Sequence, residues 1–179
     1  MLKKKFKIAI TGPESTGKST LCSLLASHYQ ASVSFEYARD YLLNHSYPLT
    51  VEEIQLIHDR QLEQEAALFK QTNTLLFCDT DLFNFKIWLQ EGFNQSPEWI
   101  HQSIAQNTYD LYLLCFPDVE WVPDGIRVNQ HNRILLYEQF LTELMNAQQN
   151  VAIIKGLGDE RLKNSIAAVD DFRLRNMLG

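Results

Sequence analysis

The chain has 179 residues, of which 45% are hydrophobic, and this content excludes an intrinsically disordered protein. Lys and Arg total 16 against 22 Asp and Glu, and the net charge of -6 argues against the basic stripe typical of proteins that follow a nucleic acid. A local phosphate site stays compatible with this charge, because backbone N–H groups can form one. The length is typical of one domain, and we expect residues 1–179 to form it.

The cysteine and hydropathy patterns indicate the cellular compartment in which the protein is expected. Cys22, Cys78 and Cys115 lie in apolar stretches without a C-x-x-C spacing, which predicts buried, reduced thiols. No run approaches the roughly 18 apolar residues of a membrane span. The basic start leads directly into a short strand and a glycine turn, unlike a signal peptide. We therefore expect a cytoplasmic protein without membrane or nucleic-acid partners. Formation of a homo-oligomer is left open.

Short apolar runs alternate with longer segments of helical periodicity, the pattern of a parallel sheet covered by helices. We predict strands at residues 6–10, 31–35, 74–78, 111–115 and 151–154. One helix is predicted from about Lys18 to Tyr29. A longer one begins at Thr50, where Glu53 completes a capping-box pattern. The expected fold class is α/β, with three α/β/α layers around a central parallel sheet.

The first strand is followed by GPESTGKS, residues 12–19, which fits the P-loop pattern G-x-x-x-x-G-K-[ST]. Gly12 and Gly17 allow backbone angles and close approaches that a Cβ would block. In such a loop the backbone N–H groups surround a phosphate at a helix N-terminus, the lysine reaches the β- and γ-phosphates, and the serine binds Mg²⁺. The sequence therefore predicts a P-loop NTPase whose candidate ATP-binding residues are Gly12, Glu14, Ser15, Thr16, Gly17, Lys18, Ser19 and Thr20, with Ser19 also a metal ligand.

Charged and aromatic residues follow the second predicted strand. Glu36 is a candidate catalytic group that orients or deprotonates an attacking hydroxyl, and Arg39 is a candidate for neutralising the transferring phosphate. The alternative is an acidic helix start whose carboxylate pairs with Arg39. Phe35 and Tyr37 are candidates for stacking on a planar substrate group, and a core position for Phe35 is the alternative.

Two carboxylates follow the strand predicted at 74–78. Asp79 is the candidate magnesium ligand, because P-loop proteins hold the metal with an acidic residue at the end of a neighbouring strand. Asp81 is a candidate for binding substrate hydroxyls or acting as the base. The alternative for Asp81 is a helix N-cap for the segment from Leu82 onward, and the two roles are compatible.

The segment after the fourth strand, about residues 117–133, lacks clear periodicity and is long for a connection, which predicts a lid. Arginines that close over phosphates suit this role, and we favour Arg127 over Arg133, which is placed where the next helix could begin. Trp121 and Asp124 are candidate substrate contacts. The five histidines show no ligand spacing, so no zinc site is predicted.

Four blocks together resemble the ribosylnicotinamide kinase domain of NadR-type proteins, within the AAA-like ATP-binding P-loop kinases. They are KIAITGPESTGKSTL (residues 7–21), EYAR (36–39), CDTD (78–81) and WVPDGIR (121–127). They occur in the family's order and cover nearly the whole chain. The resemblance implies a P-loop kinase that uses ATP and Mg²⁺ to phosphorylate the 5′-hydroxyl of nicotinamide riboside, giving nicotinamide mononucleotide in NAD salvage.

The resemblance also implies site roles. Residues matching Phe35, Glu36, Tyr37 and Arg39 would face the riboside, Asp79 and Asp81 would lie at the ribose and magnesium, and Arg127 would belong to the lid. Phe35 occupies a position where the family can carry a larger aromatic. Because the P-loop begins at residue 12, we expect no preceding adenylyltransferase domain, so this chain alone would stop at the mononucleotide.

Two other functions remain open at this point. One is a kinase for another nucleoside or nucleotide, and the other is a regulatory P-loop ATPase that acts as a nucleotide switch. The sequence contains no guanine-reading N-K-x-D pattern, which favours the kinases. Turnover of ATP with and without a nucleoside acceptor discriminates between a kinase and a switch.

Overall fold

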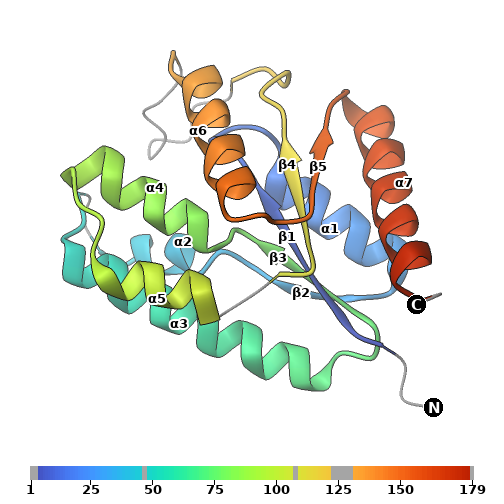
Figure 1. The fold of residues 1–179 in the computed structure, drawn as a ribbon, viewed down its shortest axis with the longest axis horizontal. Coiled ribbons are helices and arrows are strands. Elements are labelled where there is room, and N and C mark those ends of the chain that lie inside the picture. Colours follow the sequence, from blue (N-terminus) through green and yellow to red (C-terminus); the bar gives the residue numbers. More distant parts are fainter. Residues whose placement is uncertain (1–3, 46–47, 107–108, 122–130, 178–179) are drawn as a thin grey trace.

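The computed structural model describes residues 4–45, 48–106, 109–121 and 131–177. Its strands form one parallel sheet in the order β2-β3-β1-β4-β5 (Figure 1). The strands are β1 (Phe6–Thr11), β2 (Ser32–Ser34), β3 (Leu75–Asp79), β4 (Leu111–Cys115) and β5 (Val151–Ile154). The predicted parallel sheet is therefore confirmed. The strand expected at 31–35 is shorter, because β2 is an edge strand that pairs with β3 at only three positions.

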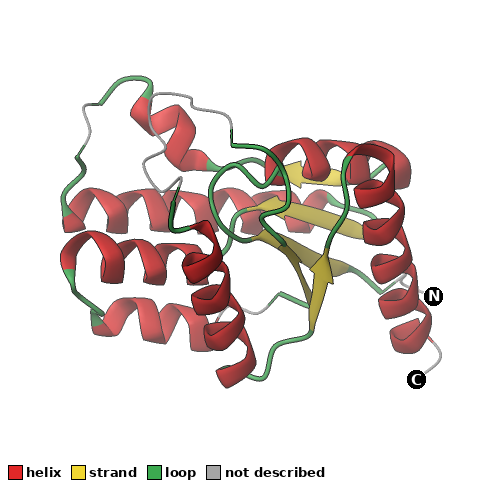
Figure 2. Ribbon diagram, turned by 90° about the horizontal axis from the view of Figure 1, so that it is seen from above, coloured by secondary structure: helices red, strands yellow, loops and turns green. Residues whose placement is uncertain are grey.

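Helices cover both faces of the sheet, giving the predicted three layers (Figure 2). They are α1 (Lys18–Tyr29), α2 (Tyr37–Leu42), α3 (Val51–Gln71), α4 (Leu82–Phe93), α5 (Glu98–Gln106), α6 (Arg133–Asn146) and α7 (Gly158–Met177). The bounds predicted for α1 are confirmed. The capping box at α3 is also confirmed: Glu53 N–H donates to Thr50 Oγ1 at 3.2 Å, and Thr50 N–H donates to Glu53 Oε2 at 2.7 Å.

Alternating side chains of the sheet feed two separate hydrophobic cores. On β1, Phe6, Ile8 and Ile10 pack with α1 and α7, whereas Ala9 faces the core formed with α2 to α6. All four side chains are buried. Because both faces of the sheet are covered, the central strands β1, β3 and β4 are mostly apolar and buried, as is usual for parallel sheets.

The three cysteines are buried and make no disulfide, as predicted from their apolar surroundings. Burial raises the pKa of the Cys115 thiol to about 11 and also raises the pKa values of the Cys22 and Cys78 thiols. Raised values keep these groups protonated and unreactive at neutral pH. Their positions indicate packing roles in the two cores.

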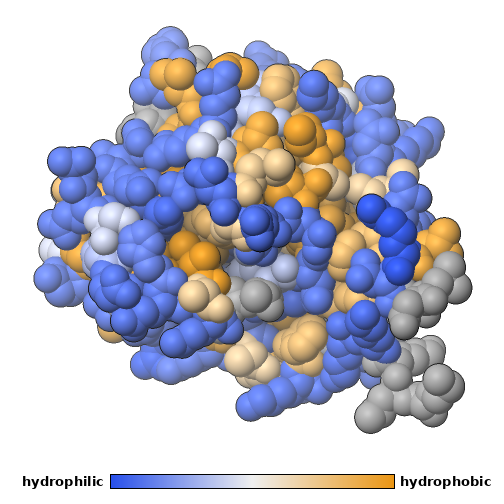
Figure 3. Space-filling view, viewed as in Figure 1, coloured by the Kyte–Doolittle hydropathy of each residue, from blue (hydrophilic) through white to orange (hydrophobic). Residues whose placement is uncertain are grey.

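The surface in Figure 3 is mostly hydrophilic, with apolar side chains gathered between α6 and α7, over the edge strand β5. Ile153 on this strand is 46% exposed. Across the described ranges, no helix combines the length and apolar character that a membrane crossing requires.

A buried histidine gives the fold a defined pH response. His58 of α3 is 4% exposed, and its ring lies 2.8 Å from Asp59 Oδ1 and 2.7 Å from Ser103 Oγ, with Phe85, Trp99 and Glu65 also around it. Burial lowers the pKa of His58 below its ordinary value of 6.5, although the neighbouring Asp59 and Glu65 oppose this shift. The folded chain therefore binds this proton more weakly than the unfolded chain does.

We expect the His58 contribution to stability to be complete above the ordinary pKa and to be lost as the pH falls below it. In urea denaturation at about pH 8 and about pH 5.5, the free energy of unfolding should fall more on acidification for wild type than for His58→Gln. Equal pH dependence in the two proteins would contradict the assignment.

Candidate active site

The P-loop connects the central strand β1 to α1. Gly12 and Gly17 have φ of 124° and 78°, and Ser15 has φ of 53°, so the loop uses backbone angles that side chains rarely adopt. A Cβ on Gly12 would lie 2.8 Å from the carbonyl oxygen of Cys115 in the adjacent strand β4. Only glycine fits this close approach between the loop and the sheet.

Side chains of the loop make hydrogen bonds with its own carbonyls. Lys18 Nζ donates to Gly12 O at 2.8 Å and to Pro13 O at 2.7 Å, and Thr16 Oγ1 also donates to Pro13 O at 2.9 Å. These contacts hold the ammonium group of Lys18 against the loop, at the N-terminal end of α1. An anion at this end would meet both a positive charge and the helix dipole.

Asp79 lies beside the P-loop because its strand pairs with β1 in a register that places Asp79 opposite Ile10. It is 2% exposed, and the Ser19 side chain is one of the groups that act on its carboxylate. Burial raises the pKa of Asp79; the nearby Glu36 raises it further, while Ser19, Lys18 and Arg39 act in the opposite direction.

The donor set fits a magnesium ion. A carboxylate and a hydroxyl are hard oxygen ligands, which Mg²⁺ prefers, and it usually takes few protein ligands because phosphates and water complete the octahedron. Within the described part of the chain there is no group of three or more His, Cys, Asp or Glu that would form an all-protein metal cage. Ser19 and Asp79 are the residues here that would hold the ion.

One cavity of about 450 Å³ joins the P-loop to a chamber between α2, α4 and α6. Its walls include all eight residues predicted to bind ATP, together with Glu36 and Arg39. The chamber is lined by Ala38, Leu42, Asn84, Ile87, Trp88, Glu91, Gly92, Leu136 and Phe140. The space is therefore charged at the phosphate loop and largely apolar further in.

Glu36 and Arg39 face this cavity as an ion pair, with Arg39 Nε 2.9 Å from Glu36 Oε2. The pairing considered as the alternative from the sequence is confirmed, and contact of either side chain with a phosphate acceptor stays a prediction. Two glutamines of α3 hold the segment that carries them. Gln64 Nε2 donates to Phe35 O at 2.8 Å, and Gln61 Oε1 accepts from Tyr37 N–H at 2.8 Å.

Asp81, a second predicted site residue after β3, is fully buried and is not among the residues that line the cavity. Its Oδ1 accepts from Phe83 N–H at 2.6 Å and from Asn84 N–H at 3.3 Å, so the N-cap alternative is confirmed. Burial raises the pKa of Asp81 to about 6. Contact between Asp81 and a substrate stays a prediction.

The predicted aromatic contacts also lie outside the cavity walls. Phe35 is 55% exposed, so it is no core residue, and Tyr37 packs against the core shared by α2 to α6. Trp121 is half-buried, with the Arg133 guanidinium 5.8 Å from its ring centroid. Whether these rings meet a substrate stays a prediction.

Two predicted site residues, Asp124 and Arg127, lie outside the described residues, as does most of the segment expected to form a lid. Arg133 is described and is the first residue of α6, which agrees with its predicted place at the start of the next helix. Its Nη1 donates to Ser15 O at 3.1 Å and to Val119 O at 2.8 Å. The arginine that we ranked lower from the sequence therefore contacts the P-loop directly.

Sequence reasoning missed the α4 wall of the cavity, made of Asn84, Ile87, Trp88 and Glu91. Their spacing of three, one and three residues places them on one helical face, directly after the Asp81 cap, so the sequence spacing could have identified this wall. Arg161 of α7 was also missed, although it donates to the P-loop carbonyl of Thr16 at 3.0 Å. No local pattern marks Arg161, because these two residues are 145 positions apart.

Comparisons with known proteins agree with this geometry. The family described as an AAA domain matches residues 7–161. The trifunctional NAD biosynthesis/regulator protein NadR of Escherichia coli K12 is 28% identical over 124 residues, which are 67% of this chain and 30% of the relative. NadR of Salmonella typhimurium LT2 is 29% identical over 128 residues, with the same coverage. The chain thus spans about 30% of the length of these curated relatives.

Solved structures show the same fold. A crystal structure of NadR protein in complex with NR has a TM-score of 0.82 and 26% identity, covering 96% of this chain and 52% of that one. A thymidylate kinase from Ehrlichia chaffeensis has a TM-score of 0.66 at 12% identity, covering 96% of this chain and 98% of that one. The second likeness concerns the fold alone.

Proposed function

This chain belongs to the AAA domain family, and on that basis we propose that it is an ATP- and magnesium-dependent kinase that converts nicotinamide riboside to nicotinamide mononucleotide. We further propose that residues 1–179 act as one kinase domain. The observation that carries the proposal is the cavity in which the P-loop meets the Glu36–Arg39 pair and the α4 wall. Such a cavity brings a phosphate donor and a hydroxyl acceptor together.

The chain's own residues supply positioning and charge for an in-line transfer. The P-loop N–H groups and Lys18 bind the β- and γ-phosphates of ATP, at the end of the cavity nearest α1. Glu36 orients the 5′-hydroxyl and accepts its proton, while a bond forms between that oxygen and the γ-phosphorus. The bond from the γ-phosphorus to the β,γ-bridging oxygen breaks, and ADP leaves. Arg39 balances charge beside Glu36.

Ser19 and Asp79 would hold the magnesium, which when bound would neutralise charge on the β- and γ-phosphates. Glu36 is our choice of base over Asp81, because Glu36 lines the cavity and Asp81 is enclosed beneath α4. Both groups were candidates from the sequence, and the cavity geometry supports this choice.

The chamber suits a nicotinamide ring. Trp88 and Phe140 provide aromatic surface, and Leu42, Ile87 and Leu136 provide apolar walls. Nicotinamide riboside carries a positive charge on its ring, and the acidic side chains of Glu36 and Glu91 line the same cavity. The relative solved with NR bound supports the same acceptor, since 96% of this chain aligns with it.

The test is ATP-dependent phosphorylation of a nucleoside panel that contains nicotinamide riboside, thymidine, uridine and adenosine, with an acceptor-free control. We expect one ADP per nicotinamide mononucleotide and little ADP without acceptor. In a Trp88→Ala variant, KM for nicotinamide riboside should rise by about tenfold while KM for ATP changes little, because the truncated ring lies in the acceptor chamber.

Other outcomes lead to the alternatives. Preference for another nucleoside would retain the kinase and overturn the acceptor. ADP formation that no nucleoside stimulates, with ATP still bound, would overturn the kinase and favour a regulatory ATPase.

A further inference from the structure

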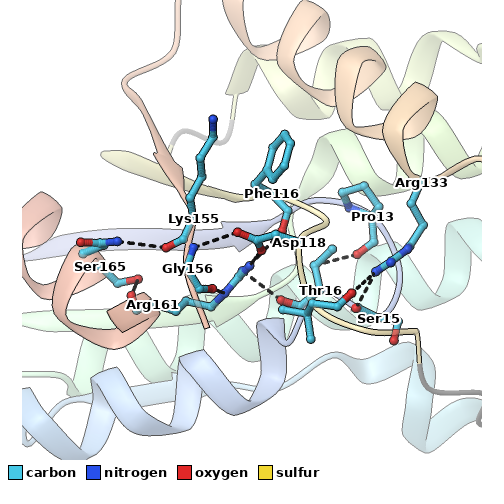
Figure 4. Close-up of polar contacts among 12 residues, drawn as sticks. Pro13, Ser15, Thr16, Phe116, Asp118, Arg133, Lys155, Gly156, Arg161 and Ser165 are labelled. Carbon is cyan, nitrogen blue, oxygen red and sulfur yellow. Dashed lines mark hydrogen bonds and ion pairs between the residues drawn. The ribbon is translucent and has the colours of Figure 1, made fainter. Parts of the chain in front are cut away.

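Arg161 of α7 lies at the junction of three loops at the carboxyl edge of the sheet (Figure 4). It is 5% exposed, and it donates to three backbone carbonyls: Thr16 O at 3.0 Å, Phe116 O at 2.9 Å and Gly156 O at 2.8 Å. Its charge is paired with Asp118, whose other carboxylate oxygen accepts from Gly156 N–H at 2.8 Å. A buried arginine that donates to three carbonyls and one carboxylate is held in one orientation.

The contact with Thr16 has a geometric consequence inside the P-loop. In a planar trans peptide the carbonyl and the following N–H point in opposite directions. Because Arg161 draws the carbonyl of Thr16 toward α7, the N–H of Gly17 points to the other side, toward the interior of the loop. N–H groups directed inward in this way form the concave binding site for a phosphate.

Arg133 acts on the preceding peptide in the same manner. Its Nη1 donates to Ser15 O at 3.1 Å, so the N–H of Thr16 is also directed away from the arginine. Ser15 has φ of 53°, a left-handed conformation that is unfavourable for a non-glycine residue and needs support from its surroundings. Figure 4 shows both arginines reaching the loop, Arg133 from α6 and Arg161 from α7.

We propose that Arg161 and Arg133 are positioning residues that preset the P-loop for phosphate by holding the carbonyls of Thr16 and Ser15 outside it. The inference rests on the proposed function only in that the loop binds the phosphates of the donor. Arg161 is the main element, because it is buried, paired with Asp118 and bonded to three separate segments. The requirement is for the planar guanidinium group, because the contacts to Thr16, Phe116 and Gly156 leave from three separate nitrogen atoms of one rigid fork, whereas all donors of a lysine share a single nitrogen.

The experiment measures binding of magnesium tripolyphosphate by calorimetry, a probe that has a phosphate chain and no nucleoside. Arg161→Lys keeps the charge, Arg161→Met removes it, and Arg175→Met removes an exposed arginine from the same helix as a matched control. We expect Arg161→Lys and Arg161→Met to weaken binding by about tenfold to a hundredfold, the loss typical of misplaced binding groups. Arg175→Met should bind like wild type.

A merely structural role would reduce the number of binding sites per mole and leave the dissociation constant of the folded fraction unchanged. Wild-type affinity in folded Arg161→Lys would overturn the proposal, since charge alone would then suffice. If neither Arg161 variant folds, the test uses Arg133→Lys, at the half-buried arginine that contacts Ser15 O. We expect this variant to bind tripolyphosphate about threefold to tenfold more weakly. Wild-type affinity in Arg133→Lys would overturn the proposal.

Tripolyphosphate binding needs no acceptor, so this test is separate from that of the proposed function. A failed nucleoside panel with weakened Arg161 variants would remove the substrate and keep the positioning role. If the wild type is an active kinase and its Arg161→Lys variant binds tripolyphosphate normally, the substrate is kept and the positioning role is removed.

Discussion

Replacing Lys18 by Ala should lower kcat/KM for phosphotransfer by about 10²–10³-fold, the loss expected when one preorganised donor is removed from a transferring phosphate. The ammonium lies 2.8 Å from Gly12 O and 2.7 Å from Pro13 O, held at the loop by its own carbonyls. Its loss should weaken charge balance in the transition state more than it weakens ATP binding, so kcat should fall more than KM for ATP rises.

The measurement is steady-state kinetics with both substrates varied, with folding verified by urea denaturation. Lys163→Ala, an exposed position on α7, is the matched control and should behave like wild type. If Lys18→Ala keeps full phosphotransfer, the proposed mechanism is wrong.

Replacing Asp79 by Asn should separate activity from stability. Asn keeps the shape of the side chain but removes the anionic ligand, so the magnesium concentration for half-maximal activity should rise by about tenfold to a hundredfold. Burial raises the pKa of Asp79, which means that the folded chain disfavours its charge. Without metal at neutral pH, the free energy of unfolding should therefore stay equal or increase in the variant.

A magnesium titration of kinase activity and urea denaturation without metal measure the two effects. Asp159→Asn, on an exposed part of α7, controls for loss of one negative charge. An unchanged magnesium requirement in Asp79→Asn would remove Asp79 from the metal site.

Much of the fold was predictable because its signals are local. The apolar runs of β3, β4 and β5 and the bounds of α1 depend on residues close together in the chain. The capping box of α3 joins Thr50 and Glu53, three residues apart, and the P-loop occupies eight consecutive residues. The edge strand β2 was predicted less well, because its length depends on its pairing with β3, which involves only three positions.

The candidate site was predicted in part. Strand ends gave Glu36, Arg39 and Asp79 from the rule that ligands bind at the carboxyl edge of a parallel sheet. From the sequence, Asp81 could bind substrate or cap a helix, and only the structure showed that its carboxylate accepts from the first N–H groups of α4. Helical periodicity identifies the face of α4 that carries Trp88. The same periodicity is found whether such a face packs against a core or lines a cavity, so the sequence could not distinguish the two.

The sequence by itself determined the layered α/β architecture, the phosphate loop and the strand-end carboxylates, because periodicity, capping and turn chemistry act over a few residues. Only the tertiary structure decided the contacts that shape the loop. Arg161 meets Thr16 across 145 residues, and Arg133 meets Ser15 across 118. Such contacts depend on how α6 and α7 pack against the sheet, which is set by the summed burial of both cores and leaves no local trace in the chain.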